Sequence, residues 1–524
     1  MSKQHKDVII AGGGLAGLTL AHQLKQTKPE LDILVLERNQ FPVPEKVAKV
    51  GESTVEIGSR YLNHTLGLKE HFNERHLRKH GLRCFFGEPQ DDFSKQDELG
   101  VSELFGIPTY QIDRGAIENQ LQRSVTQNGV QVLGGVSTKR VDLSSATKSV
   151  CIESVNNGEQ KFTSPWVIDA AGRQALAKNA LGLTKANNHQ GNALWFRVDR
   201  QIKLDEWSNN QAWTERVKQQ GTRWLSTNHL MGAGYWVWVI PLDNGATSIG
   251  IVMDDQAFSE GDFSSVDTTM DWLRQHQPKC AEALEGADVL DYVVINDYSH
   301  SCKQMFSDQG WGVTGESGVF ADPFYSPGSD FIAFNNTFIN DLIADSFDGN
   351  DIRLKSRVYQ ALNQSFFDST LSLYEGEYGG FGDRRMMSLK LVWDYAYYWG
   401  VLSLLFFKEA MTDITLMREL TPVLSRAQSL NQHVQKGFRQ RAKQRIVLPA
   451  KGIFMNQYNV PCLKHFNRIL EDDSLTVAQA LPQNIELLSD LSAMILDMLG
   501  DSASSKISDH EREILGDYRN SVLA

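Results

Sequence analysis

The sequence contains no apolar stretch long enough to cross a membrane. Its most apolar segment, Val401–Phe407, is far shorter than the roughly 20 residues that a spanning helix requires. Residues 1–7 are polar and lead directly into an apolar strand-like run, so they lack the charged and then apolar plan of a signal peptide. We therefore expect a cytoplasmic protein with no membrane span.

The sequence also contains few cysteines and no excess of positive charge. The five cysteines are an odd number and form no CxxC pair, which is typical of reduced thiols in the cytoplasm. The 52 Lys and Arg are outnumbered by 64 Asp and Glu, and the resulting net charge of −12 argues against a nucleic-acid-binding surface. No His, Cys or acidic residues have a metal-ligand spacing, so we expect no metal site. At about 100 to 200 residues per domain, the length predicts two to four domains.

A glycine-rich turn lies near the N-terminus between a predicted strand, 8–11, and an amphipathic helix, 15–24. Its G-x-G-x-x-G motif consists of Gly12, Gly14 and Gly17. Such glycines permit a tight turn and close approach to a pyrophosphate at the helix N-terminus, which is typical of dinucleotide binding. A second predicted strand, 33–36, ends in Glu37, where a carboxylate can accept the ribose hydroxyls. The cofactor contacts expected beside these positions are Ala16 and Arg38.

Three later segments favour FAD over NAD. Residues 166–173 and 311–316 each predict a buried strand that ends in small residues, and residues 110–121 predict a helix led by Arg114. They resemble the later cofactor segments of FAD domains of the glutathione-reductase and hydroxybenzoate-hydroxylase type. The resemblance implies that Arg114 contacts the flavin nucleotide and that Gly315 and Glu316 hold the ribityl chain, although Glu316 replaces the usual Asp. A capping acid on a buried strand and an exposed arginine at a helix start are the alternatives.

Because these segments are far apart, the FAD-binding domain must be discontinuous. We predict an α/β fold with a Rossmann-like FAD-binding domain of the glutathione-reductase and hydroxybenzoate-hydroxylase type, an interleaved β-sheet substrate domain and an α-helical C-terminal region. The FAD-binding domain is expected over 1–88, 105–185 and 300–345, the sheet over 89–104 and 186–299, and the helical region over 346–524. In that region Asn484 is expected to cap a helix that Gly500 ends.

Two motifs resemble those of flavin-dependent halogenases. Residues 49–53, Lys-Val-Gly-Glu-Ser, resemble the G-E-[AS] box beside the flavin, so Gly51 and Ser53 are expected at the cofactor. Residues 235–241 reproduce W-x-W-x-I-P, the motif by which halogenases differ from their monooxygenase relatives. Trp236 and Trp238 would face one side of a strand and form a wall that keeps the organic substrate away from the flavin. An aromatic core strand is the alternative.

Lys79 occupies the K-x-G position of a third halogenase-like segment, residues 77–87. The resemblance implies that Lys79 is the catalytic residue. Reduced FAD and dioxygen would give a flavin hydroperoxide, halide would be oxidised to hypohalous acid, and the Lys79 amine would capture that acid. Desolvation favours the neutral, nucleophilic form of an amine. A solvated surface lysine is the ordinary alternative.

Residues 319–328 depart from the halogenase pattern in two places. They follow Gly315-Glu316, where the family carries its flavin and halide loop, and the expected halide residues are Ser326 and Gly328. Tyr325-Ser326 replaces the Glu-Ser step of tryptophan halogenases, so the segment is closer to the phenol and pyrrole type. Pro327 removes one backbone N–H from the expected anion site. The site would then hold bromide or iodide, hold chloride weakly, or hold no halide.

The halogenase resemblance covers residues 5–345 and implies FADH2- and O2-dependent halogenation of a phenol or pyrrole-like substrate, and the donor lost at Pro327 suggests a preference for bromide. Tyr325 and the aromatic segment around Trp393 are expected to add to the substrate wall, with core packing as the alternative for Trp393. FAD would need a separate flavin reductase, because the sequence shows no second dinucleotide fingerprint for NAD(P)H, with its glycines between a strand and a helix. A monooxygenase without halide use and a non-catalytic flavoprotein stay open, as does delivery of the substrate free or on a carrier protein.

Overall fold

A computed structural model describes residues 4–46, 49–154, 158–259, 261–500 and 507–524 of the protein. The chain divides into two compact units, and each is assembled from three separate stretches. The first unit contains 1–75, 112–187 and 299–367, and the second contains 76–111, 188–298 and 368–524. Among the described residues, no helix is both long and apolar enough to span a membrane.

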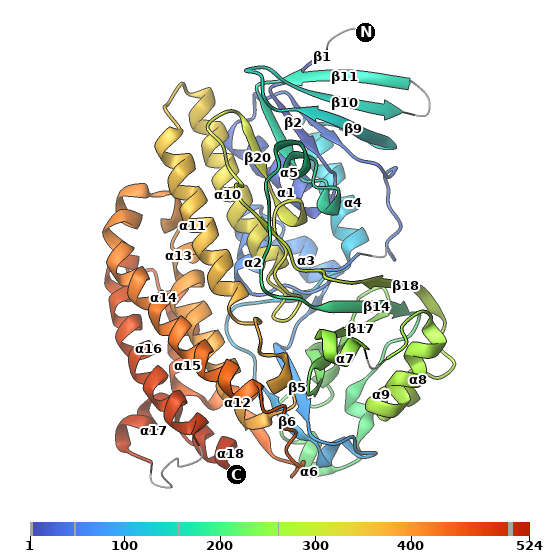
Figure 1. The fold of residues 1–524 in the computed structure, drawn as a ribbon, viewed down its shortest axis with the longest axis vertical. Coiled ribbons are helices and arrows are strands. Elements are labelled where there is room, and N and C mark those ends of the chain that lie inside the picture. The colour runs from blue at the N-terminus through green and yellow to red at the C-terminus, as the bar shows by residue number, and fades with distance from the viewer. Residues whose placement is uncertain (1–3, 47–48, 155–157, 260, 501–506) are drawn as a thin grey trace. The chain divides into compact units, whose positions relative to one another are not determined.

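A five-stranded parallel sheet forms the centre of the first unit (Figure 1). Its strands, in spatial order, are β20 (Trp311–Val313), β12 (Trp166–Asp169), β2 (Val8–Ala11), β3 (Ile33–Leu36) and β8 (Gln131–Leu133). Ile10 on β2 pairs with Val35 on β3 and Ile168 on β12. Every residue of these three strands is buried, which accounts for their continuous apolar runs in the sequence.

Helices α1 (Leu15–Thr27), α4 (Arg114–Gln127) and α10 (Gly328–Phe347) accompany this sheet, and α1 packs against both of the others (Figure 1). Shorter helices of the same unit are α2 (Glu56–Arg60), α3 (Lys69–Arg75) and α5 (Leu176–Leu181). A four-stranded sheet has the order β1 (Gln4–His5), β11 (Gly158–Ser164), β10 (Lys148–Ser154) and β9 (Val136–Asp142). The carboxyl ends of the parallel strands meet at one edge, where α/β sheets bind ligands.

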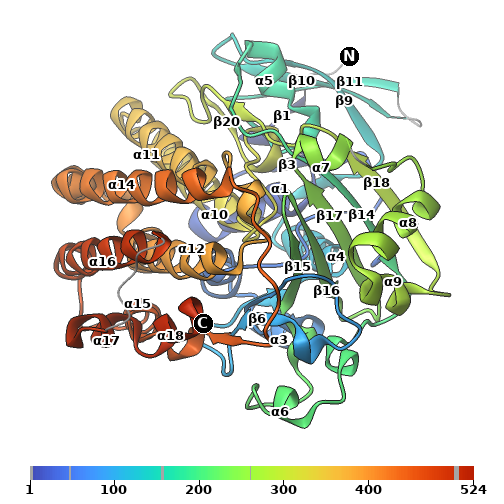
Figure 2. The same cartoon turned by 60° about the horizontal axis from the view of Figure 1, so that its bottom comes forward.

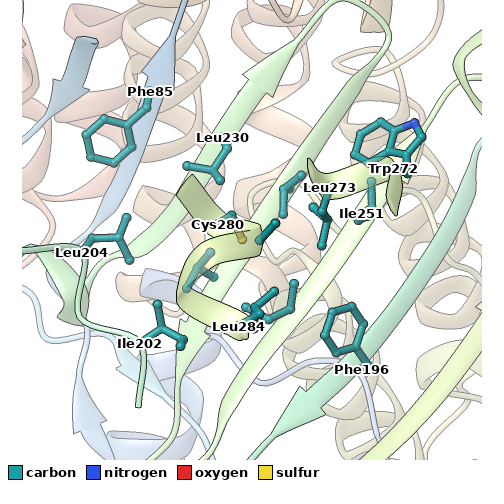
Figure 3. Close-up of a cluster of buried hydrophobic side chains, with 14 of the residues drawn as sticks. Phe85, Phe196, Ile202, Leu204, Leu230, Ile251, Trp272, Leu273, Cys280 and Leu284 are labelled. Carbon is teal, nitrogen blue, oxygen red and sulfur yellow. The ribbon is translucent and has the colours of Figure 1, made fainter. Parts of the chain in front are cut away.

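An eight-stranded mixed sheet forms the centre of the second unit. Its order is β18 (Val289–Ile295), β14 (Asn192–Val198), β17 (Thr247–Met253), β16 (Tyr235–Pro241), β15 (Thr227–Gly232), β5 (Leu82–Phe86), β6 (Asp97–Gly100) and β21 (Phe454–Asn456). Helices α8 (Val266–His276) and α9 (Pro278–Leu284) cover one face and bury an apolar cluster there. Figure 3 shows Cys280 and Leu284 of α9 beside Phe196 and Ile251 of the sheet.

The C-terminal residues of the second unit are helical, but they also supply a strand to its sheet. The long helices α12 (Arg384–Tyr397), α14 (Ile414–Ala442) and α16 (Val477–Leu499) lie side by side (Figure 2). Strand β21 follows α14 and pairs with β6, so residues 368–524 group with the sheet, whereas the sequence predicts a separate helical region from 346. Smaller helices complete the end of the chain: α15 (Pro461–Ile469), α17 (Asp509–Leu515) and α18 (Tyr518–Leu523).

The predicted start of α16 at Asn484 is wrong. The helix begins at Val477 after Thr476, whose side chain and that of Gln479 form a capping box. Asn484 lies inside the helix, where its amide donates to the carbonyl oxygen of Gly400 at 2.8 Å. Gly500 does follow the last helical residue, as expected.

Candidate active site

The glycine turn has the geometry of a dinucleotide cradle. Gly12 has a φ of +116°, and a Cβ at this position would lie 2.1 Å from the carbonyl oxygen of Ala170. A Cβ on Gly17 would lie 1.9 Å from the carbonyl oxygen of Gly12, so only glycine lets α1 pack so close to the turn. At Gly14 a Cβ would meet only Glu118, at 3.9 Å. The middle glycine therefore leaves open space in front of the helix N-terminus, as a pyrophosphate requires.

Other predicted cofactor residues lie around this turn. The N–H of Gly13 donates to a carboxylate oxygen of Glu37 at 2.8 Å, and the second oxygen accepts the backbone N–H of Asn39 at 2.9 Å. Gly315 has a φ of +63°, and a Cβ there would lie 3.0 Å from the methyl group of Ala16. The structure thus brings Ala16, Glu37 and Gly315 to the edge where the parallel strands end, while Arg38 is exposed just beyond Glu37.

The loops that follow β12 and β20 are joined to each other. The N–H of Thr314 donates to the carbonyl oxygen of Asp169 at 3.0 Å. The Asp169 carboxylate accepts the N–H groups of Ala171 at 3.1 Å and Ala177 at 2.7 Å. Burial raises the pKa of Asp169, and the hydrogen bonds that it accepts oppose that rise. Glu316, at the end of β20, forms an ion pair with Arg173, which follows β12, at 3.5 Å.

The Gly-Glu-Ser box and Arg114 also come together. A guanidinium nitrogen of Arg114 donates to the carbonyl oxygen of Val50 at 2.5 Å, and another donates to Glu118 at 2.9 Å. A Cβ on Gly51 would lie 2.9 Å from the Arg114 guanidinium, so glycine permits this approach. Glu52 accepts the N–H of Ile112 through its carbonyl oxygen at 2.7 Å, and Ser53 is buried. These contacts place the box beside the start of α4.

The turn before α10 contains the expected halide residues. Tyr325 and Ser326 both adopt left-handed backbone conformations, with φ values of 70° and 57°. The N–H of Ser326 donates to the carbonyl oxygen of Pro323 at 3.0 Å, so it is already used within the turn. Pro327 is the N-cap residue of α10, and the helix has no side-chain cap. Gly328 is exposed at the first position of the helix, where N–H groups have no acceptor within the helix.

Lys79 belongs to the second unit and is buried. It directly follows β4 (Leu77–Arg78), which pairs with β7 (Tyr110–Gln111). Its backbone N–H donates to the carbonyl oxygen of Thr109 at 2.8 Å, and its exposed fraction is 3%. Burial and, to a smaller extent, the nearby Lys79 lower the pKa of His229 to about 3. Lys79 is therefore an interior lysine and not a solvated surface lysine.

The two tryptophans of W-x-W-x-I-P point to the same side of β16. Val237 and Val239 face the apolar cluster under α8 and α9, so Trp236 and Trp238 project from the opposite face. Their ring centroids are 5.7 Å apart. The indole N–H of Trp236 donates to the Tyr378 hydroxyl at 3.1 Å. That of Trp238 donates to Ser248, also at 3.1 Å, and both rings are buried.

Trp393 lies in the core of the helical bundle. It is fully buried on α12, and its indole N–H donates to the side-chain oxygen of Asn431 on α14 at 2.9 Å. This placement favours core packing, the alternative that the sequence leaves open, over a substrate wall. Tyr325, by contrast, is half-buried in the turn before α10 and packs on Phe324 with ring centroids 4.5 Å apart.

Comparison with known proteins identifies the family of this chain. The FAD binding domain family matches residues 5–281. The flavin-dependent halogenase chlA of Dictyostelium discoideum is 25% identical over 444 residues, which cover 76% of this chain and 70% of that protein. The 1H-pyrrole-2-carbonyl-[peptidyl-carrier protein] chlorinase of Pseudomonas fluorescens is 24% identical over 349 residues, 63% of this chain and 73% of that enzyme. The chain belongs to the flavin-dependent halogenases of the FAD binding domain family.

A solved structure confirms the fold of this halogenase. The crystal structure of halogenase PltM in complex with phloroglucinol and FAD superimposes with a TM-score of 0.69 over 93% of this chain and 99% of that chain, at 16% identity. The predicted α/β FAD-binding fold is thus confirmed, and the curated relatives support the predicted halogenase family.

The residues of the halogenase fit FAD. The family match supports FAD as the cofactor, and three features of the first unit suit a dinucleotide. The space in front of Gly14 is open, the first turn of α1 has no side-chain cap to compete with a phosphate, and Glu37 lies at the end of β3. Among the described residues, no three His, Cys, Asp or Glu side chains come together to hold a metal ion.

Several residues at these sites are not evident from the sequence of the halogenase. Arg173, His229 and Tyr378 each contact a partner from a distant segment, so spacing along the chain gives no signal for them. His229 illustrates this, because its ring packs on Trp236 with centroids 5.2 Å apart and its Nδ1 lies 3.3 Å from the carbonyl oxygen of Arg83. A polar residue in a buried strand was the one sequence feature that could have drawn attention to it.

Proposed function

We propose that this enzyme halogenates an electron-rich aromatic compound of the phenol or pyrrole type, with Lys79 as the residue that receives hypohalous acid. The burial of Lys79 carries this proposal, because a lysine with a purely solvating role would lie at the surface. The relatives support the substrate class: one acts on a carrier-bound pyrrole, and the PltM structure holds the phenol phloroglucinol.

Reduced FAD supplies the electrons that activate dioxygen, so that halide is oxidised to hypohalous acid. Burial favours the neutral form of the Lys79 amine, whose lone pair can attack the halogen. The N–X bond forms as the O–X bond breaks, and the proton lost by nitrogen leaves with hydroxide as water. The aromatic carbon then takes the halogen as the N–X bond breaks, the ring loses a proton, and the Lys79 nitrogen takes up a proton, so that the amine is restored.

The surroundings of Lys79 restrict what else the oxidant can reach. His229 is neutral and adds no positive charge beside Lys79, because its pKa is about 3. We propose that Trp236 and Trp238 keep the organic substrate away from the flavin, a role to which their position on one face of β16 is suited. Their hydrogen bonds to Tyr378 and Ser248 fix both rings.

Bromide preference follows from the turn before α10. Pro327 has no N–H, and the N–H of Ser326 donates to Pro323, so few backbone donors remain for an anion. Bromide is more weakly hydrated than chloride, so its binding free energy falls less when such donors are lacking. The same shortage supports the second candidate, a flavin monooxygenase that inserts oxygen and uses no halide.

We further propose that FADH2 comes from a separate flavin reductase. The sequence contains one G-x-G-x-x-G motif that follows a strand and opens a helix, and the close approaches at Gly12 and Gly17 support its use as the FAD cradle. The substrate can arrive free, as a phenol, or on a carrier protein. Assaying free phenols, free pyrroles and a pyrrolyl carrier thioester in parallel separates the two routes.

The test combines a halide panel with a substitution at Lys79. Purified enzyme receives FAD, a flavin reductase with NADH, and chloride, bromide or iodide, and mass spectrometry follows the aromatic products. We expect Lys79→Met to lose halogenation by on the order of a hundredfold or more while O2 consumption continues. Lys95→Met, which alters an exposed lysine of the same unit, is the matched control.

Full halogenation by Lys79→Met would remove the assigned role of Lys79. Oxygen insertion without incorporation of any halide would contradict the halogenase proposal and favour the monooxygenase. Product formation only from the carrier thioester would exclude a free substrate.

A further inference from the structure

Arg173 and Glu316 form an ion pair at the edge of the sheet where the cofactor is expected. The guanidinium Nε lies 3.5 Å from a Glu316 carboxylate oxygen, and both side chains are 38% exposed. The guanidinium also lies over the ring of Phe320, 5.6 Å from its centroid. An exposed arginine is usually mobile, but this one is held by two neighbours from the loop after β20.

The backbone on both sides of the ion pair is fixed. Asp169 binds the N–H groups of Ala171 and Ala177, and these residues flank Arg173. On the other loop, Thr314 donates to the carbonyl oxygen of Asp169, and the Lys178 amine donates to the carbonyl oxygen of Gly318 at 2.9 Å. The two side chains are therefore presented from rigid loops, as a binding site requires.

The backbone segments that carry the ion pair adjoin the glycine cradle. Gly12 approaches the carbonyl oxygen of Ala170, three residues before Arg173, so closely that a Cβ would lie at 2.1 Å. Gly315, the neighbour of Glu316, packs on Ala16 in the first turn of α1. A half-exposed guanidinium on a loop that adjoins a cradle for a dianionic pyrophosphate has the charge and the donors to bind an oxygen of the same cofactor.

The ion pair also explains why residue 316 is Glu and not the shorter Asp. FAD domains of this type usually have Asp at the corresponding position, and Asp is one methylene shorter. The 3.5 Å contact with Arg173 uses the additional length. An Asp on the same backbone would end short of the guanidinium.

We propose that Arg173 is an FAD-binding residue that works as a unit with Glu316. Its guanidinium binds an oxygen of the cofactor, and its ion pair holds the Glu316 carboxylate extended toward the ribityl hydroxyls. The proposal rests on FAD binding and is independent of halogenation. It can be tested in protein that shows no halogenating activity.

The test is a titration of the purified apoprotein with FAD, followed by flavin fluorescence and calorimetry. We expect Arg173→Gln to raise the Kd for FAD about tenfold, because a charge-assisted hydrogen bond is lost. Arg173→Lys keeps the charge and should raise the Kd less. Arg353→Gln is the matched control, since Arg353 pairs with Asp351 at 2.6 Å in an exposed part of the same unit, and its Kd should be unchanged.

A double substitution separates direct contact from positioning. In a Glu316→Gln background, Arg173→Gln should weaken FAD binding further, because its own contact with the cofactor is lost. No added effect in that background would overturn direct contact, and an unchanged Kd for Arg173→Gln alone would overturn the whole proposal. Thermal unfolding of each apoprotein verifies the fold. If Arg173→Gln does not fold, the Kd of Arg173→Lys for FAD tests the proposal instead.

Discussion

Gly250 determines how Trp238 lies on the sheet. The two residues are directly opposite in the pairing of β16 with β17. A Cβ on Gly250 would lie 2.1 Å from Cζ2 of the Trp238 indole and 2.3 Å from Cε2 and Cη2. The ring thus lies flat across the glycine, and its N–H reaches the Ser248 hydroxyl at 3.1 Å.

Gly250→Ala should therefore displace the indole. The buried ring would have to leave its position and give up the hydrogen bond to Ser248, which costs about 1 kcal/mol. Forcing a methyl group into a packed interior costs about 1 to 3 kcal/mol more. We expect the free energy of unfolding to fall by about 2 to 4 kcal/mol. Urea denaturation followed by circular dichroism measures this change.

The same substitution in a Trp238→Leu background isolates the clash. With the indole removed, the added methyl group should cost little, and the difference between the two backgrounds is the interaction energy of the pair. Gly106→Ala serves as the control, because a Cβ there would meet only the Asn467 side chain at 3.9 Å. A cost that persists in the Trp238→Leu background, or no cost in the native background, would refute the position of the ring.

Two further predictions concern the bundle and the halide turn. Burial raises the pKa of Glu377, which lies 2.7 Å from buried Lys390, to about 8. The folded protein then keeps a proton that the unfolded chain releases near pH 4.3, so this contribution to stability is lost as pH rises from about 4.3 to 8. Glu377→Gln should flatten the dependence of unfolding free energy on pH in this range, and an unchanged slope would contradict the assignment. Pro327→Ser restores a backbone N–H, so we expect a lower KM for chloride with little change for bromide; equal KM values before and after would argue against the missing donor.

The parts of the fold that could be predicted are those that depend on nearby residues. The glycine turn follows from the requirements of Gly12 and Gly17, and the strands beside it follow from continuous apolar runs. The catalytic role of Lys79 stays a prediction from a local segment, and the structure shows only that this lysine is buried. The structural role of a residue in a turn or motif depends on neighbours within a few positions along the chain. Such a role can therefore be predicted from the sequence.

The missed features depend on contacts between distant segments. Strand β21 has three residues and too little pattern to be recognised, yet its pairing with β6 joins the helical C-terminal residues to the eight-stranded sheet. The Arg173–Glu316 ion pair crosses from the loop after one strand to the loop after another. The helix start at Asn484 failed for a different reason: the sequence also contains the Thr476–Gln479 capping box, which satisfies the first N–H groups better.

The backbone conformation of the halide turn, Tyr325–Gly328, indicates where an anion can bind. Two consecutive left-handed residues, Tyr325 and Ser326, each cost of order 1 to 3 kcal/mol, and neither is a glycine or asparagine. Such strain persists only where the surroundings or a function require it. The strained turn directs the Ser326 N–H back to Pro323, so the turn offers little to an anion, whereas the uncapped start of α10 at Gly328 presents donors and the positive end of the helix dipole. A halide bound here would therefore sit at the N-terminus of α10, where Pro327 removes one donor and the N–H of Asp330 donates to the Pro327 carbonyl oxygen at 3.1 Å, which leaves the N–H groups of Gly328 and Ser329.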